Sequence, residues 1–232
     1  MDKIIIVAID GPAGAGKSTI ARSVAERLGF LYIDTGAMYR AIALWALRTG
    51  TALDDMHRLE ALAVSAELKL DGPGKISLNG EDVSAAIREP SISEAASKVA
   101  AVGAVRRALV EKQQQLGEST SVVMEGRDIG TVVFPEAQVK FYLDANPRIR
   151  ADRRALELAE RGQECSVDDL VREIEERDSR DRSRAHSPLR QAEDAVYLDT
   201  SALSPLEVED EILRVVRART SNGKSLTRQH VE

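Results

Sequence analysis

Residues 10–19 read DGPAGAGKST, which matches the pattern G-x-x-x-x-G-K-[ST] from Gly11 to Ser18. The apolar run IIIVAI at residues 4–9 comes directly before it and predicts a buried parallel strand. Residues 19–28 follow with the spacing of an amphipathic helix. Because a strand, a glycine loop and a helix occur in this order, the stretch predicts a phosphate-binding loop in an α/β core.

The residue types of this loop suit a nucleoside triphosphate. Glycines let backbone N–H groups approach phosphate oxygens, and the helix N-terminus adds unpaired donors and partial positive charge. Lys17 would reach the β- and γ-phosphates, and the Ser18 hydroxyl would bind Mg²⁺ together with the phosphates. The residues predicted to bind the triphosphate are Gly11, Pro12, Ala13, Gly14, Ala15, Gly16, Lys17, Ser18 and Thr19.

Composition narrows the class of protein. With 232 residues and a 43% apolar share, the chain suits one α/β domain carrying an insert. A formal net charge of −6 argues against a general nucleic-acid binder, and no apolar run approaches the ~18 residues of a membrane span. The one cysteine, Cys165, excludes an internal disulfide and fits a reducing cytoplasm. We therefore expect a cytoplasmic monomer without nucleic-acid or membrane partners.

Strand and helix patterns alternate along the chain, which predicts an α/β fold: a five-stranded parallel sheet flanked by helices. Residues 34–36 have the composition of a turn. Further strands are predicted at 31–33, 122–124, 139–144 and 195–199, and helices at 37–47, 54–68, 94–116, 147–161, 167–184 and 205–219.

One region differs in character from this core. Residues 68–78 read as strand, turn and strand, and Asn79-Gly80 is a second hairpin signal, which predicts a small α+β insert. The expected domains are a phosphate-loop core at 1–59 and 101–219, an insert at 60–100, a lid at about 154–168 and a flexible tail at 220–232. The lid is expected because the arginines Arg148, Arg150, Arg153 and Arg154 lead into the polar stretch at 160–163, which could close over phosphates and exclude water.

Three more stretches combine charged residues with strand or helix ends. DTGAMYR at 34–40 follows a strand, so Arg40 could hold a phosphate, or it could be a solvated helical arginine. EGRD at 125–128 also follows a strand and indicates a site rather than a charged turn. In the run 175–184, helical spacing places Arg177, Asp181 and Arg184 on one face. Such runs are often solvated helices, but phosphoryl transfer between two anions needs several arginines.

Together these stretches resemble the bacterial cytidylate kinases, a family of nucleoside monophosphate kinases. The likeness covers residues 5–218 and rests on IDGPAGAGKST at 9–19, DTGAMYR at 34–40, EGRDIGTVVFP at 125–135 and ERDSRDR at 176–182. It implies transfer of a phosphoryl group from ATP to CMP or dCMP with Mg²⁺. The insert is similar to the monophosphate-binding domain of that family.

The resemblance also implies the roles of single residues. Ser97, Arg106 and Asp128 would read the cytosine, because a carboxylate favours its amino group and repels the carbonyl of uracil. The acceptor-binding residues implied are Thr35, Arg40, Ser97, Arg106, Arg127, Asp128, Arg177, Asp181 and Arg184. The catalytic residues implied are Lys17, Arg127, Arg177 and Arg184.

Other functions remain open on the residues alone. A kinase for UMP, AMP or dTMP would differ only in the base pocket. A nucleotide-dependent switch acting on a protein partner is a more distant alternative, against which the absence of an Asn-Lys-x-Asp motif argues. A nucleotide-binding module without catalysis is a third alternative, which the intact Lys17 and arginines disfavour.

Overall fold

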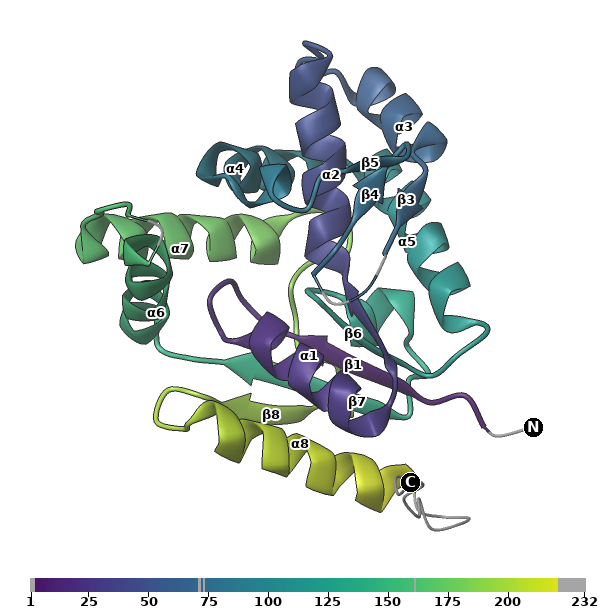
Figure 1. The fold of residues 1–232 in the computed structure, drawn as a ribbon, viewed down its shortest axis with the longest axis vertical. Helices are drawn as coiled ribbons and strands as arrows, with labels where there is room; N and C mark the ends of the chain where they lie inside the picture. Colours follow the sequence, from purple (N-terminus) through teal and green to yellow (C-terminus); the bar gives the residue numbers. More distant parts are fainter. Residues whose placement is uncertain (1–2, 71, 73, 161, 221–232) are drawn as a thin grey trace.

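The central sheet has five parallel strands in the order β2-β6-β1-β7-β8, which confirms the predicted fold class. Figure 1 shows the computed structural model, which describes residues 3–70, 72, 74–160 and 162–220. The strands are β1 (Ile6–Asp10), β2 (Leu31–Asp34), β6 (Val122–Gly126), β7 (Val139–Asp144) and β8 (Val196–Asp199).

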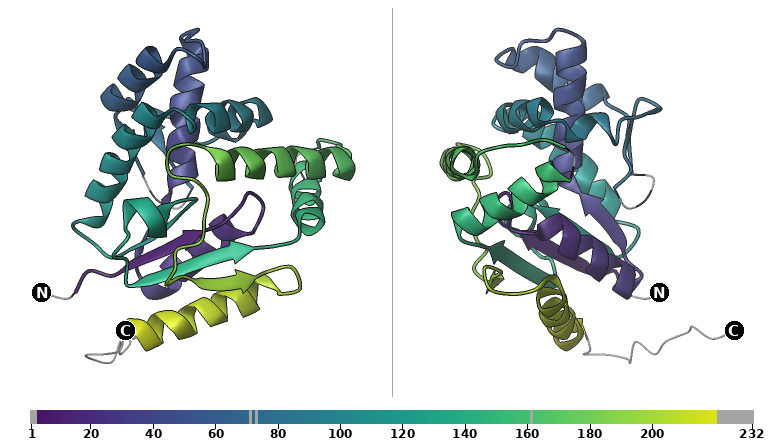
Figure 2. Two further views of the ribbon diagram at one scale, coloured as in Figure 1. Left: turned by 180° about the vertical axis from the view of Figure 1, so that it is seen from behind. Right: turned by 60° about the vertical axis from the view of Figure 1, so that its left-hand side comes forward.

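The apolar run of β1 is explained by burial on both faces of the sheet. Val7 and Ile9 face a cluster formed with α1 (Lys17–Leu28) and α8 (Pro205–Thr220). Ile6 and Ala8, which alternate with them, face a second cluster on the opposite side. Figure 2 shows α8 lying along one face of the sheet. A strand covered on both sides has no polar face, so it reads as a continuous apolar run.

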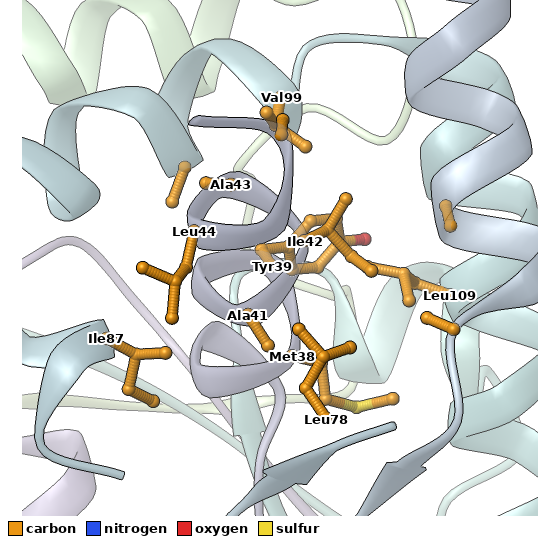
Figure 3. Packing of buried hydrophobic residues seen from close by; sticks show 14 of the residues in the cluster. Met38, Tyr39, Ala41, Ile42, Ala43, Leu44, Leu78, Ile87, Val99 and Leu109 are labelled. Carbon is orange, nitrogen blue, oxygen red and sulfur yellow. The ribbon is translucent and has the colours of Figure 1, made fainter. Parts of the chain in front are cut away.

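A second body is built around α2 (Thr35–Arg48), which rises away from the sheet in Figure 1. Its buried side chains, such as Ile42, Val99 and Leu109, form a core of their own (Figure 3). A three-stranded antiparallel sheet, β3-β4-β5, lies within it, as the two hairpin signals predict. Its other elements are α3 (Met56–Ser65), β3 (Leu68–Lys69), β4 (Ser77–Leu78), β5 (Glu81–Asp82), η1 (Ala86–Arg88), α4 (Pro90–Val99) and α5 (Gly103–Gly117).

Two helices, α6 (Pro147–Ala159) and α7 (Val167–Ser183), form a hairpin that projects from the sheet. They share a small cluster that includes Leu158 and Ile174. Ser166 caps α7, its hydroxyl accepting a hydrogen bond from the Asp169 N–H at 3.4 Å. The short turn η2 (Ile129–Val133) follows β6.

Some element predictions were wrong. Residues 34–36 are not a turn, because Asp34 caps α2 directly and accepts a hydrogen bond from the Ala37 N–H at 2.9 Å. The helix predicted at 94–116 is two helices with a break at 100–102, where Val102 adopts an extended backbone. The helix predicted at 54–68 ends already at Ser65, whereas Leu68 pairs with Leu78 in the strand that was predicted to begin there.

The C-terminal prediction is tested in part. Helix α8 continues through Thr220, the first residue of the expected tail, and residues 221–232 lie outside the described part of the chain. Across the described ranges, no helix combines the length and apolar character needed to cross a membrane.

Candidate active site

A cavity of about 1340 Å³ lies where the carboxyl ends of β1, β2 and β6 meet the second body and α7. Open parallel sheets bind ligands at this edge. The cavity brings together the sequence-predicted site residues, except that Gly11 and Pro12 do not line it. Those lining it are Ala13, Gly14, Ala15, Gly16, Lys17, Ser18, Thr19, Thr35, Arg40, Ser97, Arg106, Arg127, Asp128, Arg177, Asp181 and Arg184.

The phosphate loop is held close to the neighbouring strand. Gly11 has a φ of 147°, and a Cβ on it would lie 1.9 Å from the Leu143 carbonyl oxygen, so only glycine fits there. The Lys17 Nζ donates a hydrogen bond to the Pro12 carbonyl at 2.7 Å. Burial and, to a smaller extent, the nearby Arg127 lower the pKa of Lys17 to about 7. The loop therefore holds an ammonium group that lacks the full stabilisation an anion would provide.

Ser18 and Glu125 supply oxygen atoms beside the loop. Glu125 is buried at the end of β6, and the Tyr32 hydroxyl donates to its Oε1 at 2.7 Å. Burial raises the pKa of Glu125, and Asp34 raises it too, while Lys17 and a hydrogen bond with Ser18 lower it. Hydroxyl and carboxylate oxygens are the ligands that Mg²⁺ prefers, so these residues fit that ion. No group of three His, Cys, Asp or Glu able to hold a metal occurs within the described residues, so phosphate oxygens would have to complete the shell.

The start of α2 presents Arg40 to the cavity. Arg40 Nη2 pairs with Asp34 Oδ2 at 2.8 Å, and the other oxygen of Asp34 caps the helix. The Thr35 hydroxyl donates to the Glu125 carbonyl at 2.7 Å. Arg40 Nε is buried and has no hydrogen-bond partner among the described residues. The helix start therefore fixes a guanidinium that keeps an unused donor.

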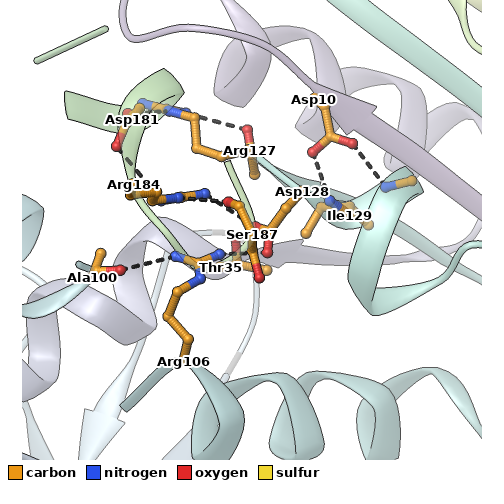
Figure 4. A network of polar contacts seen from close by, with 12 residues as sticks. Asp10, Thr35, Ala100, Arg106, Arg127, Asp128, Ile129, Asp181, Arg184 and Ser187 are labelled. Carbon is orange, nitrogen blue, oxygen red and sulfur yellow. Dashed lines mark hydrogen bonds and ion pairs between the residues drawn. The ribbon is translucent and has the colours of Figure 1, made fainter. Parts of the chain in front are cut away.

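A buried ion pair also lines the cavity (Figure 4). Arg106 on α5 donates to Asp128, which follows β6, and both side chains are nearly shut off from solvent. Arg106 Nη1 also donates to the Ala100 carbonyl at 3.2 Å, and its guanidinium lies 5.2 Å from the centre of the Tyr39 ring. Nearby, the buried Ser97 hydroxyl has no partner within the described chain. This part of the lining offers a carboxylate, a guanidinium and a hydroxyl to a planar polar ligand.

Arginines gather around Asp181, which lines the cavity (Figure 4). Arg127 Nε pairs with Asp181 at 3.1 Å, and Arg184 approaches Asp181 at 3.6 Å and Asp128 at 3.8 Å. Burial alone would raise the pKa of Asp181, but Arg127, Arg177 and Arg184 outweigh it and hold the pKa below its ordinary value. Burial and, to a smaller extent, Arg127 lower the pKa of Arg177 to about 10. So many cations in one place favour an anionic ligand.

One arginine differs from the sequence prediction. Arg150, grouped with the arginines of the lid, is instead buried and pairs with Asp178 at 2.7 Å. Arg184 lies one residue beyond the end of α7, as its C-cap residue, and approaches Asp181 at 3.6 Å, so it lines the same cavity as Arg177 and Asp181.

Sequence reasoning also missed several contributors. Asp34, Tyr39 and Glu125 line the cavity but were given no role, although each belongs to a quoted motif. Position directly after a parallel strand is the signal that could have identified Asp34 and Glu125.

The chain was compared with known proteins. The family model described as cytidylate kinase matches residues 7–218. A protein named cytidylate kinase from Solibacter usitatus is 60% identical over 227 residues, 97% of each chain. Another of that name, from Syntrophotalea carbinolica, is 50% identical over 222 residues, 94% of each chain. An uncharacterized protein from Eubacterium ventriosum, 10% identical, has a TM-score of 0.51, with 92% of this chain and 99% of that chain covered, and this likeness concerns the fold alone.

Proposed function

This chain belongs to the cytidylate kinase family, and from that premise we propose that its cavity transfers the γ-phosphoryl group of ATP to CMP or dCMP, giving ADP and CDP or dCDP. The observation that carries the proposal is that one cavity holds the phosphate loop, the arginine cluster and the Arg106–Asp128 pair. A triphosphate, a monophosphate and a base each have a matching surface in that space.

The base-reading end favours cytosine for a chemical reason. The Asp128 carboxylate accepts the exocyclic amino group, and Arg106 donates to the ring acceptors. Uracil would place a carbonyl oxygen against the carboxylate and leave buried polar groups unpaired, which costs far more than an exposed mismatch. We therefore expect UMP to be a poor acceptor.

The reaction needs positioning and charge neutralisation rather than a covalent intermediate. The acceptor phosphate oxygen is already anionic, so no strong general base is required. Lys17 contacts the β- and γ-phosphates, Arg40 and Arg127 hold the acceptor phosphate, and Arg177 and Arg184 neutralise charge that develops between them. Ser18, together with the phosphates, would hold Mg²⁺, which would supply further neutralisation of the triphosphate.

The domain roles belong to the same proposal. Residues 60–100 serve as the monophosphate-binding insert of the core at 1–59 and 101–219, and residues 154–168 serve as a lid that excludes water from the phosphates. A monomer in the cytoplasm remains the expected state.

A coupled assay of ADP release tests the function. ATP and Mg²⁺ are supplied with CMP, dCMP, UMP, AMP, GMP or dTMP in turn. We expect CMP and dCMP to exceed the others in kcat/KM by about two orders of magnitude or more. Preference for another monophosphate would preserve the kinase activity but reassign Arg106 and Asp128, and absence of turnover with all six would refute the kinase itself.

A further inference from the structure

Asp10 is a buried carboxylate for which the mechanism above has no use. It is the last residue of β1, directly before the phosphate loop, and is 4% exposed. Its Oδ1 accepts a hydrogen bond from the Ile129 N–H and its Oδ2 from the Gly130 N–H, both at 2.8 Å (Figure 4). Burying a carboxylate costs free energy, and this cost is seen in the pKa of Asp10, which burial raises to about 7. A buried aspartate at this position therefore needs a structural or functional reason.

The two N–H groups that Asp10 caps begin the turn η2, whose own N-cap residue is Asp128. An aspartate at an N-cap ordinarily accepts from the free N–H groups that follow it. Within the described residues Asp128 makes no such bond, and its carboxylate instead meets Arg106 and Arg184 in the cavity. Asp10, which lies 118 positions earlier in the chain on a neighbouring strand, therefore caps these N–H groups instead.

The pairing of β1 with β6 allows Asp10 to cap η2 in place of Asp128. β1 and β6 pair in parallel so that Asp10 lies opposite Gly126, and the chain turns after Gly126 to present the N–H groups of 129 and 130 to Asp10. A Cβ on Gly130 would lie 3.4 Å from Asp10 Oδ2 and 3.1 Å from the Lys140 side chain, so glycine leaves room for the close approach.

We propose that Asp10 is a positioning residue for base recognition: by capping η2 from β1, it releases the Asp128 carboxylate to read the acceptor base. The inference rests on the proposed function, because it concerns the same base pocket. When the cap is weakened, the carboxylate of Asp128 is drawn toward its own following N–H groups and away from Arg106. Recognition of cytosine then declines while the triphosphate site keeps its residues.

Asp10→Asn tests this, because the amide keeps the size of the side chain but puts an NH₂ group against one of the two donors. We expect the ratio of kcat/KM for CMP to that for UMP to fall at least about tenfold, since one buried hydrogen bond to a charged group is lost. The Kd of ATP should change less than about threefold. In an Asp128→Asn background the same substitution should leave the ratio unchanged, because the group it positions is already altered.

Asp144→Asn is the matched control. Asp144 ends the adjacent strand β7 and accepts from the N–H of its own neighbour, Ala145, at 2.8 Å. It lies outside the lining of the active-site cavity, so we expect its substitution to leave the base ratio unchanged.

Gly130→Ala is a milder second variant that strains the same contact, and it decides the matter if Asp10→Asn does not fold. A fall of a few fold in the base ratio is expected for it. The proposal is overturned if neither folded variant changes the ratio, or if Asp10→Asn weakens ATP binding while the ratio stays intact. Failure of the proposed function would appear separately, as a wild-type enzyme with no preference for CMP over UMP.

Discussion

Lys17 shows how a single residue is prepared for an anion. Its ammonium is buried in the phosphate loop, where its hydrogen bond goes to the Pro12 carbonyl rather than to a carboxylate. Burial, followed by the repulsion of Arg127, lowers its pKa to about 7. A triphosphate placed against it would raise that pKa again, so ligand binding and proton binding are coupled at this residue.

The first prediction concerns the pH dependence of ATP binding. Because free Lys17 loses its proton above about pH 7 and the bound form keeps it, ATP binding should take up protons. The Kd of ATP should therefore rise between about pH 7 and about pH 9, by up to about tenfold per unit. Titration at several pH values, with calorimetry in buffers of different ionisation heat, measures both effects. Lys17→Met should bind weakly and without this dependence, and a wild-type Kd that stays constant would contradict the prediction.

The second prediction concerns Arg177. Its Nε is buried without a hydrogen-bond partner in the described chain, and burial with repulsion by Arg127 lowers its pKa to about 10. Arg177→Met should lower kcat by about a thousandfold, because a charge-neutralising group is lost. The melting temperature should stay the same or rise slightly, since an uncompensated charge is removed.

Arg182→Met on the same helix is the control for Arg177, because Arg182 is exposed and lies outside the active-site cavity. Rate measurements and thermal melts on both variants decide the point. Equal loss of rate and of stability in Arg177→Met would show that Arg177 is structural rather than catalytic.

At the scale of elements, Arg150 joins three parts of the fold. From α6 it donates to the Ala145 carbonyl at 2.8 Å and to the Ala13 carbonyl of the phosphate loop at 2.9 Å, and it pairs with Asp178 of α7. Asp178 directly follows Arg177 in the chain. This pair therefore sets the position of α7, and with it Arg177, relative to the phosphate loop.

The third prediction follows from the burial of this pair. Asp178→Ala should lower the free energy of unfolding by about 3 kcal/mol or more, because Arg150 is left as a buried charge without its partner. The double variant Arg150→Met, Asp178→Leu should recover part of that loss: no buried charge remains unpaired, but the Ala13 and Ala145 carbonyls lose Arg150 as their donor. Urea unfolding followed by circular dichroism and fluorescence measures both. An alanine variant as stable as the wild type would show that the pair contributes nothing.

At the scale of the whole molecule, the cavity lies between two bodies with separate cores. One core surrounds α2 and the other packs on the sheet, while the α6–α7 hairpin borders the cavity from a third side. Few apolar contacts join parts that have separate cores, so their relative motion is expected to be the softest in the fold. Two substrates bound in the cavity at the same time would contact the parts that surround it and draw them together.

The fourth prediction uses the two single reporters of the chain. The sequence has one tryptophan and one cysteine, Trp45 on α2 and the exposed Cys165 on the loop between α6 and α7. With an acceptor dye on Cys165, energy transfer from Trp45 should increase when ATP and CMP are present together, and less with either alone. Unlabelled protein and a Cys165→Ser variant treated with dye serve as controls. Unchanged transfer with both substrates would exclude closure.

Local order was predictable from the chain because it depends on short-range sterics and periodicity. The glycines of residues 10–19, the apolar run before them and the alternation of strand and helix patterns led to the phosphate loop and the parallel sheet, which the structure confirms. Predictions failed where helical periodicity continues across a break in the backbone, as at residues 100–102, which divide the helix predicted at 94–116 into two. The resemblance to a family added the acceptor residues, which periodicity alone could not identify.

The pairing of charged side chains with one another could be determined only from the folded structure. Nothing in the local sequence distinguishes Arg150, buried with Asp178, from its exposed neighbour Arg148. Likewise, the capping of residues 129 and 130 by Asp10 follows from the register of β1 against β6. The physical reason is that a charged side chain is soluble in either setting, and its burial depends on partners that are far away in the chain. The sequence by itself determined the fold and the kind of ligand, and the tertiary structure decided which charges are buried, paired and aimed at that ligand.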